Sequence, residues 1–299
     1  MRGEKIVAGL IAAAGVHWLT ACAGDKPITV GSKNFTEQVI LGEIVAQHVS
    51  LRLSQRVDRK LNLGGTLLAH QAMLQGGLDL YPEYTGTALT SILKLPLSSD
   101  PAEVFAKVRA EYQARFGILW LDPLGFNNTF AMVIRGEDAR RSRIESLSDA
   151  ARYAAGKEGW TLGVGYEFQQ RPDGLPGLLK TYRLPLKGSP KTMDLGLLYK
   201  ALEQKQVDMV AANATDGLLS VMDVKVLRDD KRYFPPYQAA LTVRAGALAA
   251  RPGLKEALEQ LSGKFSDEIM RALNYQVDGK HRPVNEVAVT FLRAAGFMA

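Results

Sequence analysis

The chain has 299 residues, of which 46% are hydrophobic and 23% are charged, so it can bury a substantial core and divides most naturally into two compact domains. This composition excludes a disordered chain. Cys22 is the single cysteine, so the chain cannot form an intrachain disulfide and a small disulfide-stabilised fold is excluded. The formal net charge of +6 is spread without a dense basic run, which argues against a nucleic-acid partner.

The first 22 residues have the order of a secretory signal. Arg2 and Lys5 precede an apolar run over 6–16, and small residues end at Cys22. The ending Leu-Thr-Ala-Cys resembles a bacterial lipobox. We therefore expect residues 1–22 to be a lipoprotein signal peptide that ends at a lipidated Cys22. The mature protein would be extracytoplasmic, in the periplasm or on the outer face of the cell membrane. The alternative is a buried N-terminal helix with an incidental cysteine.

Strand and helix patterns alternate in the first part of the mature chain. Residues 28–31 predict a strand, and the next helix begins with Asn34 as its cap and Glu37 reaching back. A second helix is predicted over 66–75, capped by its own first residue, and a strand follows at 78–81. Loops after such strands are where α/β folds bind ligands.

The same alternation continues through the middle of the chain. A helix is predicted over 100–116, and a strand over 125–134 is interrupted by polar residues. A new block then opens, with predicted elements at 160–165, 175–182, 192–206 and 207–212.

Three helices without strands of their own end the chain, at 253–262, 266–277 and 285–295. We expect them to pack on the first domain, so the chain crosses twice between two lobes. Lobe I would comprise 28–131 and 238–299, and lobe II 132–237. Two crossings form a hinge, and a hinge between two α/β lobes creates a ligand cleft.

Six ordered motifs carry a resemblance to one family. They are Gly-Ser-Lys-Asn-Phe-Thr-Glu-Gln at 31–38, Tyr-Pro-Glu-Tyr-Thr-Gly-Thr at 81–87, Gly-Phe-Asn-Asn-Thr at 125–129, Arg-Pro-Asp-Gly at 171–174, Ala-Thr-Asp-Gly at 214–217 and Phe-Pro-Pro-Tyr at 234–237. From about residue 28 to the end, the chain resembles the type II solute-binding proteins of the glycine betaine, carnitine and choline importers. The resemblance implies a two-lobed α/β type II periplasmic-binding-protein fold.

The resemblance also implies a function. The protein would capture a quaternary-ammonium compatible solute and deliver it to the permease and ATPase subunits of an ABC importer, acting as a monomer without a cofactor. Relatives surround the trimethylammonium group with aromatic faces. Because such a group has no N–H to donate, it depends on cation–π attraction and nearby negative charge. A ligand carboxylate needs N–H donors, a helix N-terminus or arginine.

Tyr84 is the first candidate for the aromatic cage, because the family motif places an aromatic residue there. The backbone of the following Thr85 would lie close to the ligand. The alternative is a tyrosine packed on a loop. Tyr237 follows two prolines at the return crossing, where an extended segment would aim it into the cleft. Asn127 and Asn128 point to opposite sides of a strand, so one faces the ligand and the other makes a hinge hydrogen bond.

The remaining candidates are charged or lie at helix starts. Glu167 and Arg171 would present charge across the cleft from lobe II, or else form a surface ion pair. Asp216 is either a functional anion or, slightly favoured, the cap of the following helix. Asn34 and Phe35, with the following Thr36, could form a carboxylate site at a helix N-terminus, or an ordinary capped helix.

Two positions depart from the family pattern. Relatives often carry tyrosine where this chain has Phe130 and Asn213, so one aromatic wall is missing or supplied differently. This keeps carnitine and ergothioneine open as ligands, beside glycine betaine and choline. An amino acid or a polyamine is a further alternative.

The sequence shows no visible catalytic apparatus. The four histidines, His17, His48, His70 and His281, have no paired metal-ligand spacing, and no nucleophile elbow or phosphate-binding loop is present. We therefore expect no enzyme, no metal and no cofactor. The other non-enzymatic alternatives are the effector domain of a transcription regulator, disfavoured by the export signal, and a structural lipoprotein, which needs no cleft.

Overall fold

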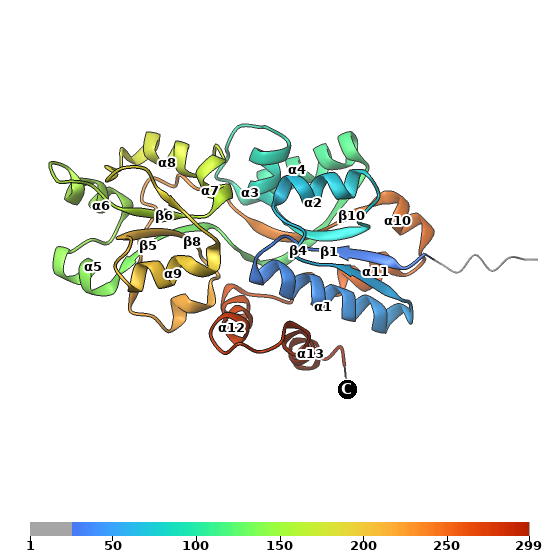
Figure 1. The fold of residues 1–299 in the computed structure, drawn as a ribbon. Coiled ribbons are helices and arrows are strands. Elements are labelled where there is room, and N and C mark those ends of the chain that lie inside the picture. Colours follow the sequence, from blue (N-terminus) through green and yellow to red (C-terminus); the bar gives the residue numbers. More distant parts are fainter. Residues whose placement is uncertain (1–25, 299) are drawn as a thin grey trace, which may run out of the picture.

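The computed structural model describes residues 26–298, which form two α/β lobes side by side (Figure 1). The predicted signal peptide and the lipidated Cys22 lie outside the described residues. No helix within residues 26–298 combines the length and apolar character needed to cross a membrane.

The elements follow in chain order. The first part of lobe I contains β1 Ile28–Gly31, α1 Thr36–Leu53, β2 Val57–Lys60, α2 Thr66–Leu74, β3 Leu80–Tyr84, α3 Thr85–Thr87, the π-helix η1 Ala88–Ile92, α4 Pro101–Phe116 and β4 Ile118–Asn127. Lobe II contains β5 Phe130–Arg135, α5 Gly136–Ser142, α6 Leu147–Ala154, β6 Leu162–Val164, α7 Tyr166–Gln170, α8 Leu175–Tyr182, β7 Lys191–Thr192, α9 Leu195–Glu203, β8 Met209–Asn213, the 3₁₀ helix η2 Gly217–Ser220 and β9 Val224–Val226. The chain then returns to lobe I with β10 Gln238–Arg244, α10 Ala245–Ala250, α11 Leu254–Glu259, α12 Asp267–Asp278 and α13 Val284–Ala294.

Each lobe is built on a five-stranded sheet. The strand order is β2-β1-β3-β10-β4 in lobe I and β7-β6-β8-β5-β9 in lobe II. In lobe I, β1 is parallel to β2 and β3, whereas β10 is antiparallel to β3 and β4. In lobe II, β6 is parallel to β7 and β8, whereas β5 is antiparallel to β8 and β9. The two-lobed α/β fold predicted from the sequence is confirmed.

The chain crosses between the lobes twice. The outward crossing is the short link at 128–129 between β4 and β5, and the return crossing lies at 227–237 between β9 and β10. The sequence-based boundary at 131/132 falls inside β5, and the one at 237/238 falls where β10 begins. We retain the division into 28–131 with 238–299, and 132–237, as a proposal.

The C-terminal helices pack mainly on lobe I. Helices α11, α12 and α13 all contact α1, and their apolar residues share one core with the lobe I sheet. Helix α12 also contacts η2 of lobe II, which the sequence analysis did not predict, and Figure 1 shows it below the junction of the lobes. It therefore forms a third connection between the lobes, made by packing.

The predicted helix caps are wrong at three places. Helix α1 has Phe35 and not Asn34 as its N-cap, and the side chain that reaches back is Gln38, whose Oε1 accepts from the Lys33 amide at 3.3 Å. Helix α2 has Gly65 as its N-cap, so Thr66 is the first helical residue. Asp216 precedes η2 but its side chain does not cap it. The side chains of Glu37, Thr66 and Asp216 do not cap these helices. They make contacts at the cleft between the lobes instead.

Candidate solute-binding cleft

The two lobes enclose a cavity of about 770 Å³. Seven aromatic residues are among its walls, namely Phe35, Tyr84, Phe130, Tyr166, Phe168, Tyr199 and Tyr237. Acidic residues in its lining are Glu37, Glu167, Asp194, Asp216 and Asp278, and basic ones are Lys33 and Arg171. A cavity of this size holds a small organic molecule, and these walls combine aromatic faces with charges of both signs.

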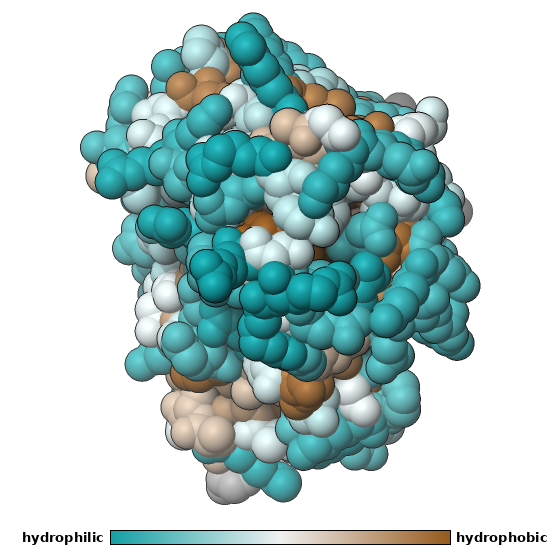
Figure 2. Space-filling view, turned by 90° about the vertical axis from the view of Figure 1, so that its left-hand side faces the viewer, coloured by the Kyte–Doolittle hydropathy of each residue, from teal (hydrophilic) through white to brown (hydrophobic). Residues whose placement is uncertain are grey.

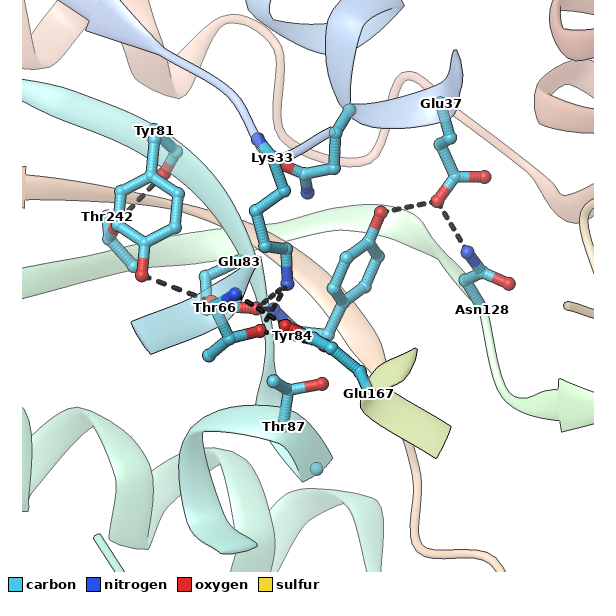
Figure 3. Close-up of polar contacts among 12 residues, drawn as sticks. Lys33, Glu37, Thr66, Tyr81, Glu83, Tyr84, Thr87, Asn128, Glu167 and Thr242 are labelled. Carbon is cyan, nitrogen blue, oxygen red and sulfur yellow. Dashed lines mark hydrogen bonds and ion pairs between the residues drawn. The ribbon is translucent and has the colours of Figure 1, made fainter. Parts of the chain in front are cut away.

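Lys33 places an ammonium group at the lobe I side of the cavity (Figure 3). Its Nζ lies 2.6 Å from Glu83 Oε1 and donates to Thr66 Oγ1 at 3.3 Å. Glu83 is fully buried and also accepts from the Tyr81 hydroxyl at 3.1 Å and the Tyr84 amide at 2.7 Å. Because both partners are buried and well bonded, the pair is a fixed part of the wall.

Glu37 lies at the meeting point of both lobes and the C-terminal helices. Its carboxylate accepts from the Tyr84 hydroxyl at 2.6 Å and from Asn128 Nδ2 at 2.8 Å (Figure 3). It also accepts from Asn274 Nδ2 at 3.2 Å and from the hydroxyl of Thr215 in lobe II. Burial raises the pKa of Glu37, although all four hydrogen bonds oppose that rise. The predicted capping role of Glu37 is wrong, because the carboxylate is used to join four segments at the cleft.

Tyr84 ends strand β3 and lines the cavity. Its ring stacks on Phe35 with centroids 6.2 Å apart, and Lys33 Nζ lies 4.7 Å from its centroid. Only 4% of the residue is exposed. The structure therefore places both predicted residues at the cavity, with one cation already against the tyrosine ring.

Arg171 projects from lobe II against two aromatic rings that contact each other. Its Cζ lies 5.0 Å from the Phe130 centroid and 5.6 Å from the Tyr237 centroid, and its guanidinium pairs with both oxygens of Asp173. The Tyr237 hydroxyl donates to the same carboxylate at 2.6 Å. Burial would raise the pKa of Asp173, but the hydrogen bond and charge of Arg171 outweigh it and lower the value.

Besides Thr215, two further side chains of lobe II reach lobe I directly. Glu167 accepts from the Thr66 amide at 2.5 Å and from its hydroxyl at 3.2 Å, and Arg171 Nη1 donates to Thr87 Oγ1 at 3.0 Å. Arg171 also lies 3.6 Å from Glu167. Glu167 and Arg171 therefore both reach across the cleft, and their ion pair is not the surface pair of the alternative, because only 9% of the Arg171 side chain is exposed.

Asp216 lines the cavity from the lobe II side. Its Oδ2 accepts from the Asn213 amide and the Tyr199 hydroxyl, each at 3.0 Å. Burial raises its pKa to about 7, with smaller contributions from the charges of Glu37 and Asp278. The cap favoured for Asp216 is therefore wrong, and the carboxylate instead faces a cavity with an acidic side.

The remaining predicted residues divide between the cavity and the hinge. Asn34 and Asn128 are in the cavity lining. Asn127 instead accepts from the Tyr237 amide at 2.6 Å, which is the hinge hydrogen bond expected of one member of this pair. The Thr85 hydroxyl donates to Pro236 O at 3.0 Å and accepts from the Gln238 amide, so it ties the start of α3 to the return crossing rather than facing the cavity.

Several cavity residues were not among the predicted site residues. They include Lys33, Glu37, Thr87, Phe168, Asp194, Tyr199, Asn274 and Asp278. Lys33, Glu37 and Thr87 lie inside the motifs at 31–38 and 81–87, so these three site residues could have been predicted from the motifs. Asn274 and Asp278 come from α12, and no sequence pattern indicated that this helix reaches the cleft.

A cavity walled by aromatic and charged side chains, between two α/β lobes joined by two crossings, defines this chain as a two-lobed solute-binding protein. The comparisons agree with this class. A solved structure described as a glycine betaine/carnitine/choline ABC transporter is similar to it with a TM-score of 0.75 and 29% identity, over 90% of this chain and 99% of that one. A family model described as the substrate binding domain of ABC-type glycine betaine transport systems matches residues 26–294. The chain belongs to this family.

Two curated relatives are similar over most of the chain. The ergothioneine transport permease/ergothioneine binding protein EgtU of Helicobacter pylori is 36% identical over 91% of this chain, which spans 48% of the length of that protein. The glycine-betaine-binding protein of Pseudomonas aeruginosa is 34% identical over 97% of this chain and 94% of its own length.

Proposed function

We propose that this protein is the solute-binding subunit of an ABC importer, that it captures a small quaternary-ammonium solute, either a betaine or a choline-type ion, and that it delivers this solute to a membrane permease. The observation that carries the proposal is the aromatic and acidic lining of the interlobe cavity. Aromatic faces and nearby negative charge attract a trimethylammonium group. The group has no N–H, so it needs no hydrogen-bond acceptor. Binding between the lobes would favour the closed arrangement, which the permease then recognises.

The two ends of a betaine match different parts of the cavity. Phe130 and Tyr237 supply aromatic faces beside Arg171, and the ammonium of Lys33 lies on the lobe I side. A ligand carboxylate would bind between these two cations, because charge-assisted hydrogen bonds are the strongest available to it. The quaternary nitrogen would then lie toward the acidic side, formed by Glu37, Asp216 and Asp278. The rings of Tyr84 and Tyr199, whose hydroxyls bond to Glu37 and Asp216, would supply its aromatic faces.

A larger betaine such as ergothioneine is the second candidate ligand. A cavity of about 770 Å³ is large for glycine betaine, since cavities of 300–1,000 Å³ commonly hold drug-sized ligands. The similarity to EgtU, 36% identical over 91% of this chain, supports the same candidate. The replacement of two frequent family tyrosines by Phe130 and Asn213 would widen one wall for a ring-bearing ligand.

We further propose that the protein works outside the cytoplasm, held to a membrane by a lipid on Cys22. The support is the basic, apolar and small-residue order of residues 1–22. Replacing Cys22→Ser should move the protein from the membrane fraction to the soluble fraction, and retention of the variant in the membrane fraction would contradict the anchor.

The test of the binding function is a thermal-shift screen of residues 23–299 followed by calorimetry. The panel is glycine betaine, choline, carnitine, ergothioneine, several amino acids and a polyamine. We expect a saturable rise in melting temperature with at least one quaternary amine, because a ligand that binds only the folded state stabilises it. A rise with an amino acid or polyamine alone would contradict the proposed ligand class, and no rise with any solute would contradict the binding function.

A further inference from the structure

Glu167 is the side chain whose position the proposed function does not explain. A site for a ligand with a carboxylate has no need of a protein carboxylate beside its cations. Yet Glu167 reaches from α7 of lobe II to the first residue of α2 in lobe I and accepts from Thr66 N at 2.5 Å and Thr66 Oγ1 at 3.2 Å. Figure 3 shows it beside Thr66, Lys33 and Glu83.

The surroundings of Glu167 are those of a carboxylate-binding site. Thr66 supplies a backbone amide and a hydroxyl, Lys33 donates to the same hydroxyl at 3.3 Å, and Arg171 lies 3.6 Å away. Burial would raise the pKa of Glu167, but the charge of Lys33 and the Thr66 amide outweigh burial and lower it. Glu167 is therefore ionised at neutral pH, and it uses the donors that a ligand carboxylate would need.

The two nearby cations are already paired with buried acids. Lys33 lies 2.6 Å from Glu83, and Arg171 pairs with Asp173 through both of its oxygens. Glu167 thus adds a third carboxylate to two cations. A ligand carboxylate that enters this region must displace Glu167 from Thr66 or accept its repulsion, whereas a cation without a carboxylate leaves the contact in place.

We propose that Glu167 is a specificity-determining residue that joins the two lobes and competes with the carboxylate of a bound betaine for Thr66 and Lys33. It thereby raises the affinity of the cleft for quaternary ammonium ions that lack a carboxylate, relative to betaines. This inference rests on the proposed function, because it concerns the choice among quaternary amines within the same cavity.

The test compares choline with glycine betaine by calorimetry, on the wild-type protein and on Glu167→Gln. Glutamine keeps the size of the side chain and an oxygen that accepts from Thr66, but it removes the charge. We expect Glu167→Gln to bind glycine betaine more tightly and choline more weakly, so the ratio of the two Kd values shifts by about tenfold, which corresponds to about 1.4 kcal/mol.

Asp194→Asn is the matched control. Asp194 lines the cavity from the same lobe and carries the same charge, but no hydrogen bond joins its side chain to lobe I among the contacts of the described residues. We expect Asp194→Asn to weaken the binding of choline slightly and to shift the ratio of the two Kd values by less than about threefold. An equal shift in both variants would mean that the general field of the cavity sets the preference, and this would overturn the role of Glu167.

The remaining outcomes separate the two proposals. If Glu167→Gln weakens both ligands by the same factor, the residue only joins the lobes, and the competition is refuted while the solute-binding function stands. If the wild-type protein binds no quaternary amine, the proposed function fails and this inference fails with it. X-ray scattering of the ligand-free proteins adds a readout without ligand. Glu167→Ala, which removes the acceptor for Thr66, should increase the radius of gyration, whereas Asp194→Asn should leave it unchanged.

Discussion

Asp216 shows how one residue can make the stability of this protein depend on pH. Its carboxylate is held between the Asn213 amide and the Tyr199 hydroxyl, and burial raises its pKa to about 7. Glu37 and Asp278, whose pKa values burial also raises, lie near enough to add to this shift. The folded protein therefore binds a proton at Asp216 more tightly than the unfolded chain does.

We predict that the free energy of unfolding falls as the pH rises from about 5 to about 7.5, and that Asp216→Asn flattens this fall. The unfolded aspartate releases its proton near the ordinary aspartate pKa of 3.8, while the folded one keeps it up to about 7. Between these values the folded state holds more protons, so each rise in pH favours unfolding. Urea denaturation at several pH values measures the slope.

Tyr199→Phe is the control for this prediction, because it removes a donor to Asp216 and keeps the carboxyl group. Its fall in stability over the same pH range should be at least as steep as that of the wild type. A slope that is unchanged in Asp216→Asn would mean that Asp216 does not titrate in this range.

Residues inside the family motifs were the part of the site that the sequence could predict. Tyr84, Asn128, Arg171 and Tyr237 all stand in those motifs and line the cavity. The sequence could not predict which partner each polar group would choose. Asparagine and aspartate before a helix ordinarily cap it, but a cleft between lobes offers stronger partners, and those contacts join residues far apart in the chain.

At the scale of elements, helix α12 is the part of the fold that the sequence analysis placed incompletely. It was expected on lobe I, where it contacts α1, but it also packs against the lobe II turn that precedes η2. Asn274 Nδ2 donates to Thr215 O at 2.8 Å, and Arg271 Nε donates to Ala214 O at 2.8 Å. Backbone acceptors leave no trace in sequence composition, so this docking was not predictable.

Strands β2 and β10 were also missed, for different reasons. Val57–Lys60 is an edge strand with three charged or polar residues, so it has almost no apolar alternation. Gln238–Arg244 follows two prolines and is buried between β3 and β4. Its sequence is therefore an apolar run, and periodicity alone cannot distinguish such a run from a buried helix.

We predict that Gly217→Ala weakens solute binding by about tenfold or more, which corresponds to about 1.4 kcal/mol. A Cβ at residue 217 would lie 2.3 Å from the backbone nitrogen of Tyr275 in α12. The turn would have to move off the helix, and with it the cavity residues Asn213 and Asp216. Calorimetry with the ligand found in the screen measures the loss.

Gly246→Ala is the matched control, because a Cβ at that position in α10 meets nothing within 4 Å. We expect it to leave affinity unchanged and to raise the free energy of unfolding by about 0.4–1 kcal/mol. Equal affinities for the two alanine variants would mean that the contact between α12 and the turn does not shape the cavity.

At the scale of the whole molecule, the charge of the cleft has the opposite sign to the net charge of the chain. The chain carries a formal net charge of +6, whereas five acidic and two basic side chains line the cavity. Figure 2 shows that the end of lobe II is mostly hydrophilic, with small scattered hydrophobic areas. An incoming cation is thus repelled at long range by the net charge but attracted near the cleft.

We predict that the association rate of choline falls by about two- to fivefold between about 0.02 and 0.5 M salt, because the local attraction of the cleft is screened. Glycine betaine, which has no net charge, should show a smaller change. Stopped-flow fluorescence of the aromatic residues at the cleft measures both rates. A choline rate that rises with salt would show that the net charge of the chain controls the encounter.

The position of β10 affects the order in which the chain can acquire its structure. Lobe II takes all five strands of its sheet from one stretch, residues 130–226, whereas the lobe I sheet needs β10 between β3 and β4. While the chain is being made, β3 and β4 must wait, with unpaired edges, for more than a hundred later residues. Unpaired edges invite aggregation, and contacts between distant segments form slowly. A growing chain would therefore complete lobe II first, and the half that begins the sequence would be the last to fold.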